Sequence, residues 1–230
     1  MNTWIRRFWI FRRMIASRFF RILAGVNRTI QPSIKFCIKP GYHHAVRTID
    51  YDDTSNKDEW QKEVYLLAAS IAKEQGYSSV IDLGCGSAFK LIQYLGFCRT
   101  IGIETNKTYH WLQHRYPERN WLLYEDADPA QLQADLVICA DVIEHMENPD
   151  TLMQFIQTIP AQRIILSTPE RDKKKNSINF GPPENPYHYR EWNADEFRKF
   201  VSGWFVIEDQ CIFNDRSFTQ VVICKKNNLV

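Results

Sequence analysis

The stretch Val80-Ile81-Asp82-Leu83-Gly84-Cys85-Gly86-Ser87-Ala88 decides the fold. It begins as a short apolar run, which is typical of a buried strand, and continues into two glycines that predict a tight turn. Because glycine has no Cβ atom, a ligand can approach the backbone of such a turn where the next helix starts. The pattern therefore predicts a strand, a turn and a helix that bind a nucleotide-like ligand; a purely structural turn is the alternative.

The charge beside this turn separates two kinds of ligand. A dinucleotide-binding turn follows the pattern Gly-x-Gly-x-x-Gly, but the last position here is Phe89, and Asp82 places a carboxylate just before the turn. That carboxylate repels phosphate, whereas it attracts the ammonium and sulfonium groups of S-adenosylmethionine. Glu104 follows Gly84 by 20 residues, at the end of the next apolar run, where a carboxylate can accept both hydroxyls of a ribose.

Short apolar runs and helical patterns alternate along the rest of the chain. Strands are predicted over residues 79–83, 100–104, 121–124, 136–140 and 163–167. Helices are predicted over residues 57–74, 88–95, 107–116, 150–158 and 194–201. This alternation is typical of a parallel sheet with helices on both faces, and two last β-rich runs, 204–211 and 218–224, predict an antiparallel pair. The sequence therefore predicts a doubly wound α/β domain over residues 51–230.

Four motifs occur in order along this domain: Asp82-Leu83-Gly84-Cys85-Gly86, Gly102-Ile103-Glu104, Asp126-Ala127, and the run from Asp135 to His145. Together they resemble the Rossmann-like S-adenosylmethionine-dependent methyltransferases, over roughly residues 60–225. The resemblance implies a mostly parallel seven-stranded sheet with an antiparallel last strand, and S-adenosylmethionine as cofactor. The residues that it implies for the cofactor are Asp82, Gly84, Cys85, Gly86, Glu104, Asp126, Ala127 and Asp141.

The same resemblance implies a part of the cofactor for each position. The glycine turn with Asp82 lines the methionine end, Glu104 takes the ribose, and Asp126 with Ala127 takes the adenine. Asp141 forms the floor beside the transferred methyl group. Ala88 departs from the glycine often found at its position, and we expect it to adopt an ordinary helical φ.

A polar loop with several prolines, residues 167–192, follows the strand predicted at 163–167. It lies at the carboxyl end of the sheet, where ligands bind, so we expect it to cover the acceptor. The loop resembles a subgroup of bacterial methyltransferases associated with sugar and polysaccharide assembly, which implies a sugar, glycan or related hydroxylated small molecule as acceptor. Its candidate acceptor-binding residues are Arg171, Tyr187, Arg190 and Trp192; salt bridges and packing inside the loop are the alternative.

Methylation of a hydroxyl needs a base for the proton, and histidine has a suitable pKa. His145 follows the fourth predicted strand, and His188 lies in the loop, so these two are the candidate catalytic residues; purely structural histidines are the alternative. Asp141, Glu144 and His145 form a partial ligand set, but no second ligand cluster accompanies them, and no metal is predicted.

Residues 1–28 are rich in arginine and contain no acid, and their apolar residues recur at helical spacing. They predict an extra basic N-terminal helix that contacts an anionic membrane surface or an acidic partner without spanning the bilayer. A helix packed on the domain and a solvated arm are the alternatives. Residues 1–50 are thus interpreted as an N-terminal segment and linker, and the acid-rich stretch 50–59 as a hinge.

Bulk composition limits the remaining possibilities. The net charge of +2 gives no overall field for nucleic acid, so nucleic acid is not predicted as a partner. Six cysteines without a Cys-x-x-Cys pair are typical of reduced thiols, which favours a cytoplasmic protein with peripheral membrane contact at most. Two alternatives to sugar O-methylation stay open: methylation of a quinone precursor or other aromatic hydroxyl at a membrane, and a non-catalytic binding protein of the same fold. The sequence leaves the oligomeric state open.

Overall fold

The computed structural model describes residues 35–46, 52–213 and 218–226. The helix predicted over residues 1–28 lies outside this part of the chain, so its prediction stays untested. Within the described residues, no helix has both the length and the apolar character needed to cross a bilayer. All six cysteines are free thiols.

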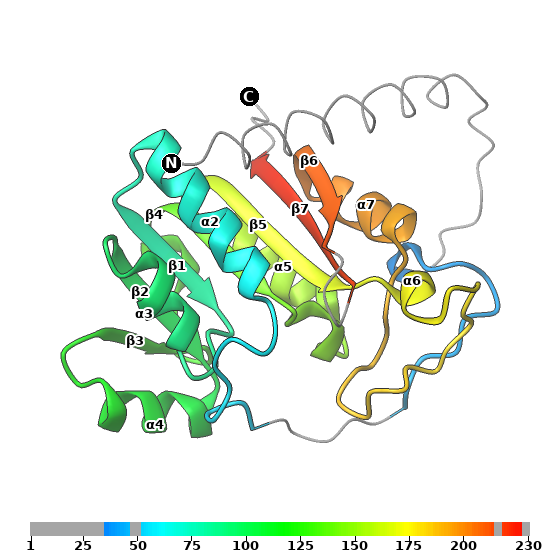
Figure 1. Ribbon diagram of the computed structural model, residues 1–230, viewed down its shortest axis with the longest axis horizontal. Helices are drawn as coiled ribbons and strands as arrows, with labels where there is room; N and C mark the ends of the chain where they lie inside the picture. The colour runs from blue at the N-terminus through cyan, green and yellow to red at the C-terminus, as the bar shows by residue number, and fades with distance from the viewer. Residues whose placement is uncertain (1–34, 47–51, 214–217, 227–230) are drawn as a thin grey trace. The chain divides into compact units, whose positions relative to one another are not determined.

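A seven-stranded sheet with the order β3-β2-β1-β4-β5-β7-β6 forms the centre of the domain (Figure 1). Its strands are β1 (Ser79–Leu83), β2 (Arg99–Glu104), β3 (Asn120–Leu123), β4 (Ala134–Ala140), β5 (Ala161–Pro169), β6 (Phe205–Ile212) and β7 (Thr219–Lys226). Neighbours among β1 to β5 pair in parallel, whereas β7 runs antiparallel to both β5 and β6. The predicted doubly wound sheet with an antiparallel last strand is confirmed.

Helices cover both faces of the sheet because successive strand residues point to opposite sides. On one face, Val80 of β1 and Leu136 of β4 belong to the same apolar cluster as residues of α2 and α3. On the other face, Ile81 and Val137 share a cluster with residues of α5 and α7. The helices are α2 (Lys62–Gln75), α3 (Phe89–Leu95), α4 (Asn106–Arg115), α5 (Pro149–Thr158), α6 (Arg171–Lys175) and α7 (Ala194–Ser202), with short 3-10 turns η1 (Lys35–Cys37), η2 (Pro129–Gln131) and η3 (Ile143–His145).

Helix α2 differs from its prediction in two respects. It begins at Lys62, and the residues before it that were predicted as helix are irregular. We also expected this helix to cover the edge of the sheet, but it packs with the central strands β1 and β4. Its buried stripe contains Ala68 and Ala72, whose small side chains allow a close approach to the strands. Gly76 closes the helix in the left-handed conformation, as predicted, with φ 68°.

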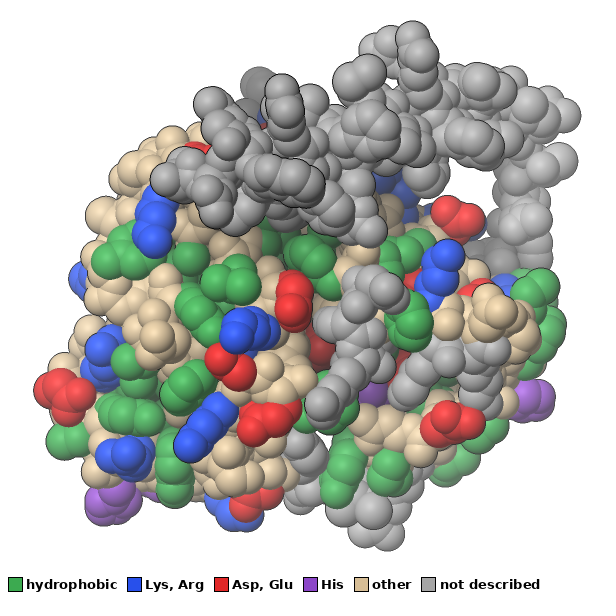
Figure 2. All heavy atoms as spheres, in the orientation of Figure 1, with side chains coloured by type: hydrophobic (Ala, Val, Ile, Leu, Met, Phe, Trp, Pro, Cys, Tyr) green, Lys and Arg blue, Asp and Glu red, His purple; other side chains and the backbone are tan. Residues whose placement is uncertain are grey.

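Residues 35–46 pack on the loop that precedes α7. The amide of His43 donates to the carbonyl of Phe180 at 2.8 Å, and the indole of Trp192 donates to the carbonyl of Phe36 at 2.9 Å. In Figure 2, acidic and basic side chains are interspersed on the visible face, without a large patch of one sign.

Candidate functional site

The glycine turn lies at the carboxyl end of β1, and both of its glycines have positive φ, 71° for Gly84 and 55° for Gly86. A Cβ atom on Gly84 would collide with the side chain of Val142, and one on Gly86 would collide with the carboxylate of Asp53. Glycine is therefore favoured at both positions by conformation, and at Gly84 the side chain of Val142 also leaves no space for a Cβ atom.

Ala88 corrects one prediction. Its φ is 55°, in the left-handed region, rather than the ordinary helical value that we expected. The residue caps α3 immediately after the turn, and its methyl group is fully buried. The turn thus imposes on Ala88 a conformation that suits glycine, at a cost of roughly 1–2 kcal/mol.

Asp82 is buried beneath the turn. The hydroxyl of Tyr65 donates to its Oδ2 at 2.8 Å, and Oδ1 has no hydrogen-bond partner among the described residues. Burial raises the pKa of Asp82 to about 7. A buried carboxylate oxygen without a donor fits a cationic ligand such as the ammonium of S-adenosylmethionine.

Glu104 ends β2 on the other side of the turn. Its Oε1 accepts the amide of Gly86 at 2.6 Å, and its Oε2 accepts the amide of Thr105 at 2.9 Å. Burial, with a smaller contribution from Asp53, raises the pKa of Glu104 to about 7. The two backbone bonds fix the carboxylate at the turn, where its remaining lone pairs can accept ribose hydroxyls.

Asp53 is a residue of this site that sequence reasoning missed. It belongs to the acid-rich stretch interpreted as a hinge, but residues 52–58 lie against the turn and α3: Ser87 donates through its hydroxyl to the carbonyl of Asn56, and Lys90 donates to the carbonyl of Lys57 at 3.0 Å. Asp53 is half-buried against Gly86, and burial raises its pKa. Asp53 is therefore a third carboxyl group at the glycine turn, beside the predicted Asp82 and Glu104.

The other predicted cofactor residues follow β3 and β4. Asp126 is exposed and Ala127 is half-buried, three and four residues after β3 ends. Asp141 directly follows β4 with φ 54°, and its Oδ1 accepts the hydroxyl of Ser167 at 2.5 Å. All of these residues lie at the same carboxyl edge as the glycine turn, because their strands are parallel.

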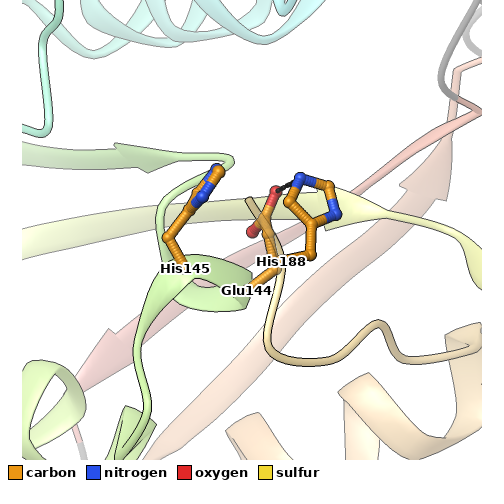
Figure 3. Close-up of side chains that lie close together, drawn as sticks. All are labelled: Glu144, His145 and His188. Carbon is orange, nitrogen blue, oxygen red and sulfur yellow. Dashed lines mark ion pairs between the residues drawn. The ribbon is translucent and has the colours of Figure 1, made fainter. Parts of the chain in front are cut away.

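His145 and His188, the two candidate catalytic residues, meet beside Glu144 (Figure 3). Their ring centroids are 4.7 Å apart and the rings are perpendicular. Nδ1 of His145 lies 2.8 Å from the carbonyl oxygen of Tyr187, and Nδ1 of His188 lies 2.8 Å from Oε1 of Glu191. Burial, and then the neighbouring His188, lower the pKa of His145 to about 4. The structure thus brings together two histidines that are 43 positions apart in the sequence, and each Nδ1 atom faces an oxygen acceptor.

The four acceptor-binding candidates divide into two groups. Arg171 is fully buried and donates through both terminal nitrogens to Glu196, at 2.6 and 3.0 Å. Arg190 is also buried, and its two terminal nitrogens donate to the carbonyls of Met146 and Glu147, at 2.5 and 2.6 Å. Trp192 is buried as well, whereas Tyr187 is half-buried next to His188. Three of the four are therefore engaged inside the protein, which favours the packing alternative for them.

A glycine turn between two buried acids, at the carboxyl edge of a sheet with this strand order, defines a Rossmann-like methyltransferase of class I. The sequence profile of a methyltransferase-domain family matches residues 54–221, and the chain belongs to this family. No curated protein matches the chain. The predictions of fold, of methyltransferase activity and of S-adenosylmethionine as cofactor are confirmed.

Several solved structures share the fold at low sequence identity. The magnesium protoporphyrin IX methyltransferase from Synechocystis PCC 6803 with bound SAH is 19% identical, with a TM-score of 0.54 over 73% of this chain and 84% of that one. The methyltransferase domain of a bacterial Hen1 is 20% identical, with a TM-score of 0.56 over 73% and 98%. The 16S rRNA methylase ArmA is 17% identical, with a TM-score of 0.52 over 76% and 89%. These likenesses concern the fold.

Proposed function

We propose that this methyltransferase transfers the methyl group of S-adenosylmethionine to a hydroxyl oxygen of a sugar, glycan or related hydroxylated small molecule. The observation that carries the proposal is the contact between the rings of His145 and His188. His145 lies four residues after Asp141, beyond the carboxyl end of β4. A group that handles the proton of a hydroxyl belongs at this place, beside the methyl end of the cofactor.

The transfer is an in-line displacement in which the carbon–oxygen bond forms as the carbon–sulfur bond breaks. Positioning of the acceptor against the methyl group supplies much of the rate. The hydroxyl proton goes to a nearby base, for which His188 has the better geometry. Glu191 accepts its Nδ1 hydrogen, and this contact stabilises the imidazolium that forms. Nε2, which lies 2.9 Å from the side-chain amide of Asn185, accepts the proton when that amide turns away.

The cofactor part of the proposal rests on three carboxyl groups. Asp82 provides an unpaired buried oxygen for the ammonium, and Glu104 faces the ribose from the end of β2. Asp53 adds a negative charge beside Gly86 and so favours the sulfonium form of the ligand. These acids argue against a non-catalytic binding protein of the same fold, because a chain that had lost methyl transfer would be expected to lose its cofactor acids.

The test of this proposal compares several classes of acceptor, and nucleic acid is one of them. One structural neighbour is an rRNA methylase, so the comparisons do not support our expectation that nucleic acid is excluded. Contact of residues 1–28 with a membrane stays a prediction, which flotation of the full chain with anionic vesicles tests against a chain that begins at residue 29.

A screen with labelled S-adenosylmethionine tests the proposal directly. The acceptors are monosaccharides and oligosaccharides, phenols and catechols, and structured RNA. We expect label in a sugar ether and loss of at least tenfold in turnover for His188→Gln, with unchanged cofactor binding by calorimetry. Label transfer only to a phenol or to RNA would overturn the acceptor class, and absence of cofactor binding would overturn the placement of the pocket.

A further inference from the structure

Glu144, His145 and His188 together form a set of metal-ligand atoms. One carboxylate oxygen and one nitrogen of each histidine lie within 4.8 Å of one another, and Oε1 of Glu144 is 4.0 Å from Nε2 of His188 (Figure 3). The residues come from η3 and from the loop before α7, which the fold brings to the same place.

The Glu144 carboxylate points to a missing positive partner. The residue is fully buried; its Oε2 accepts the hydroxyl of Thr168 at 2.9 Å, while its Oε1 has no hydrogen-bond partner among the described residues. A buried carboxylate oxygen without a donor is costly, and a bound cation removes that cost.

Both histidines are oriented as metal-binding histidines are. A ligating histidine donates its other ring N–H to a carbonyl or a carboxylate, which fixes the tautomer and the ring plane. Here the Nδ1 atoms face the carbonyl of Tyr187 and the carboxylate of Glu191, each at 2.8 Å. In both rings this contact assigns the lone pair to Nε2.

We propose that Glu144, His145 and His188 bind a divalent ion of the first transition row, such as Mn²⁺, Fe²⁺ or Co²⁺. Two imidazoles and one carboxylate suit these ions better than Mg²⁺ or Ca²⁺, which prefer oxygen ligands, and such a facial set leaves positions open for water and substrate. Bonds of about 2.1 Å require ligand atoms about 3.0–3.4 Å apart, so Oε1 of Glu144 and Nε2 of His188, which are 4.0 Å apart, must approach by about 0.6–1.0 Å on binding.

The contact between Asn185 and His188 must be exchanged for the metal to bind. The side-chain amide of Asn185 lies 2.9 Å from Nε2 of His188, and its Oδ1 accepts the amide of Tyr187 at 3.0 Å. The ion displaces the Asn185 amide from His188, which a rotation of that side chain allows. If the two histidines form only a hydrogen-bonded cluster, the contact between Asn185 and His188 remains. Loss or retention of this contact therefore distinguishes a metal site from a hydrogen-bonded cluster.

The chemical consequence of the ion rests on the proposed function. A hydroxyl bound to a divalent ion has a lower pKa, so its proton can pass to water while the oxygen attacks the methyl group. In the metal-bound enzyme His188 is therefore a ligand, and water replaces it as the acceptor of the hydroxyl proton. Binding of the ion itself does not depend on the nature of the acceptor.

Metal binding by the full chain, stripped with a chelator, tests the proposal. The probes are Mn²⁺ by calorimetry and Co²⁺ by its visible absorption, with Mg²⁺ for comparison. We expect one Mn²⁺ per chain and at least tenfold weaker binding in Glu144→Gln and in His188→Gln. The double variant His110→Gln with His114→Gln, which removes two exposed histidines of α4, is the matched control and retains the wild-type affinity.

Thermal unfolding verifies that each variant is folded, and Asn185→Ala gives a second measurement, because it frees Nε2 of His188 and should bind Mn²⁺ at least as tightly as the wild type. Absence of Mn²⁺ and Co²⁺ binding, or equal binding by the control and the Glu144 and His188 variants, overturns the metal site. Methyl transfer by the stripped enzyme at the full rate overturns the role of the ion in the reaction, yet leaves the proposed O-methylation intact. Metal binding without any acceptor methylation overturns the proposed function alone.

Discussion

The hydroxyl of Tyr65, in α2, donates a 2.8 Å hydrogen bond to Oδ2 of Asp82, in β1, and both side chains are buried. Among the described residues, Tyr65 is the side chain that donates a hydrogen bond to this carboxylate. The bond lowers the pKa of Asp82, whereas burial, which has the larger effect, raises it. A helix outside the glycine motif therefore contributes to the charge state of the acid inside it.

Tyr65→Phe should weaken the binding of S-adenosylmethionine at pH 7 by about tenfold. A hydrogen bond to a charged group contributes about 1.5–3 kcal/mol, and its loss leaves more of the Asp82 carboxyl protonated. Calorimetry at pH 7 and pH 8.5 measures the effect, which should be smaller at the higher pH. Tyr109→Phe, at an exposed tyrosine hydroxyl of α4 that contacts Gln113, is the control. Equal losses in the two variants would contradict the assignment.

Cofactor binding and stability should depend on pH in opposite directions. Asp82 and Glu104 both have a pKa of about 7, raised by burial from ordinary values near 4, so the folded chain retains their protons longer than the unfolded chain does. Their stabilising contribution is therefore complete below about pH 4 and is lost as pH rises to 7, by an amount on the order of a few kcal/mol. Affinity for the cationic cofactor should rise over the same window, because ionised carboxylates attract it.

Urea unfolding of the cofactor-free chain between pH 4.5 and 8, compared with Asp82→Asn, checks this dependence. The groups that face Asp82 are Tyr65, Lys90, Glu104 and Asp53, and Lys90 opposes the rise in its pKa. The variant should lose less stability than the wild type as pH rises. Parallel pH profiles of the two proteins would show that Asp82 does not titrate in this range.

Asp53→Asn should stabilise the cofactor-free chain and weaken cofactor binding. Burial raises the pKa of Asp53, and its charge raises that of Glu104, so removal of the charge should stabilise the folded state at pH 8. The affinity for S-adenosylmethionine should fall severalfold, since one facing carboxylate is lost. Asp52→Asn, at the exposed neighbour paired with Lys107, is the matched control and should change neither quantity measurably. If Asp53→Asn lowers both the stability of the chain and its affinity for S-adenosylmethionine, Asp53 has a structural role instead.

The predictable part of the site is the part that local sequence determines. A strand that ends in Asp82, two glycines and a second strand that ends in Glu104 can be recognised because parallel strands place their carboxyl ends at one edge. Asp53 and Tyr65 could not be placed, because they reach the turn only through the packing of a preceding segment. The acidic pair Asp52-Asp53 was the signal available for that segment. The φ of Ala88 was wrongly predicted because the turn, and not the intrinsic preference of alanine, sets it.

Arg171→Met should lower the free energy of unfolding by about 3–5 kcal/mol, because it leaves the buried Glu196 carboxylate without its two-bond partner. The sequence predicted Arg171 as an acceptor ligand, since nothing local indicates a partner 25 residues further along. Lys173→Met, at an exposed position two residues later, is the control, with an expected change below about 0.5 kcal/mol. Urea unfolding of both variants and of Glu196→Gln gives the comparison. Wild-type stability of Arg171→Met together with a raised KM for the acceptor would return Arg171 to the acceptor site.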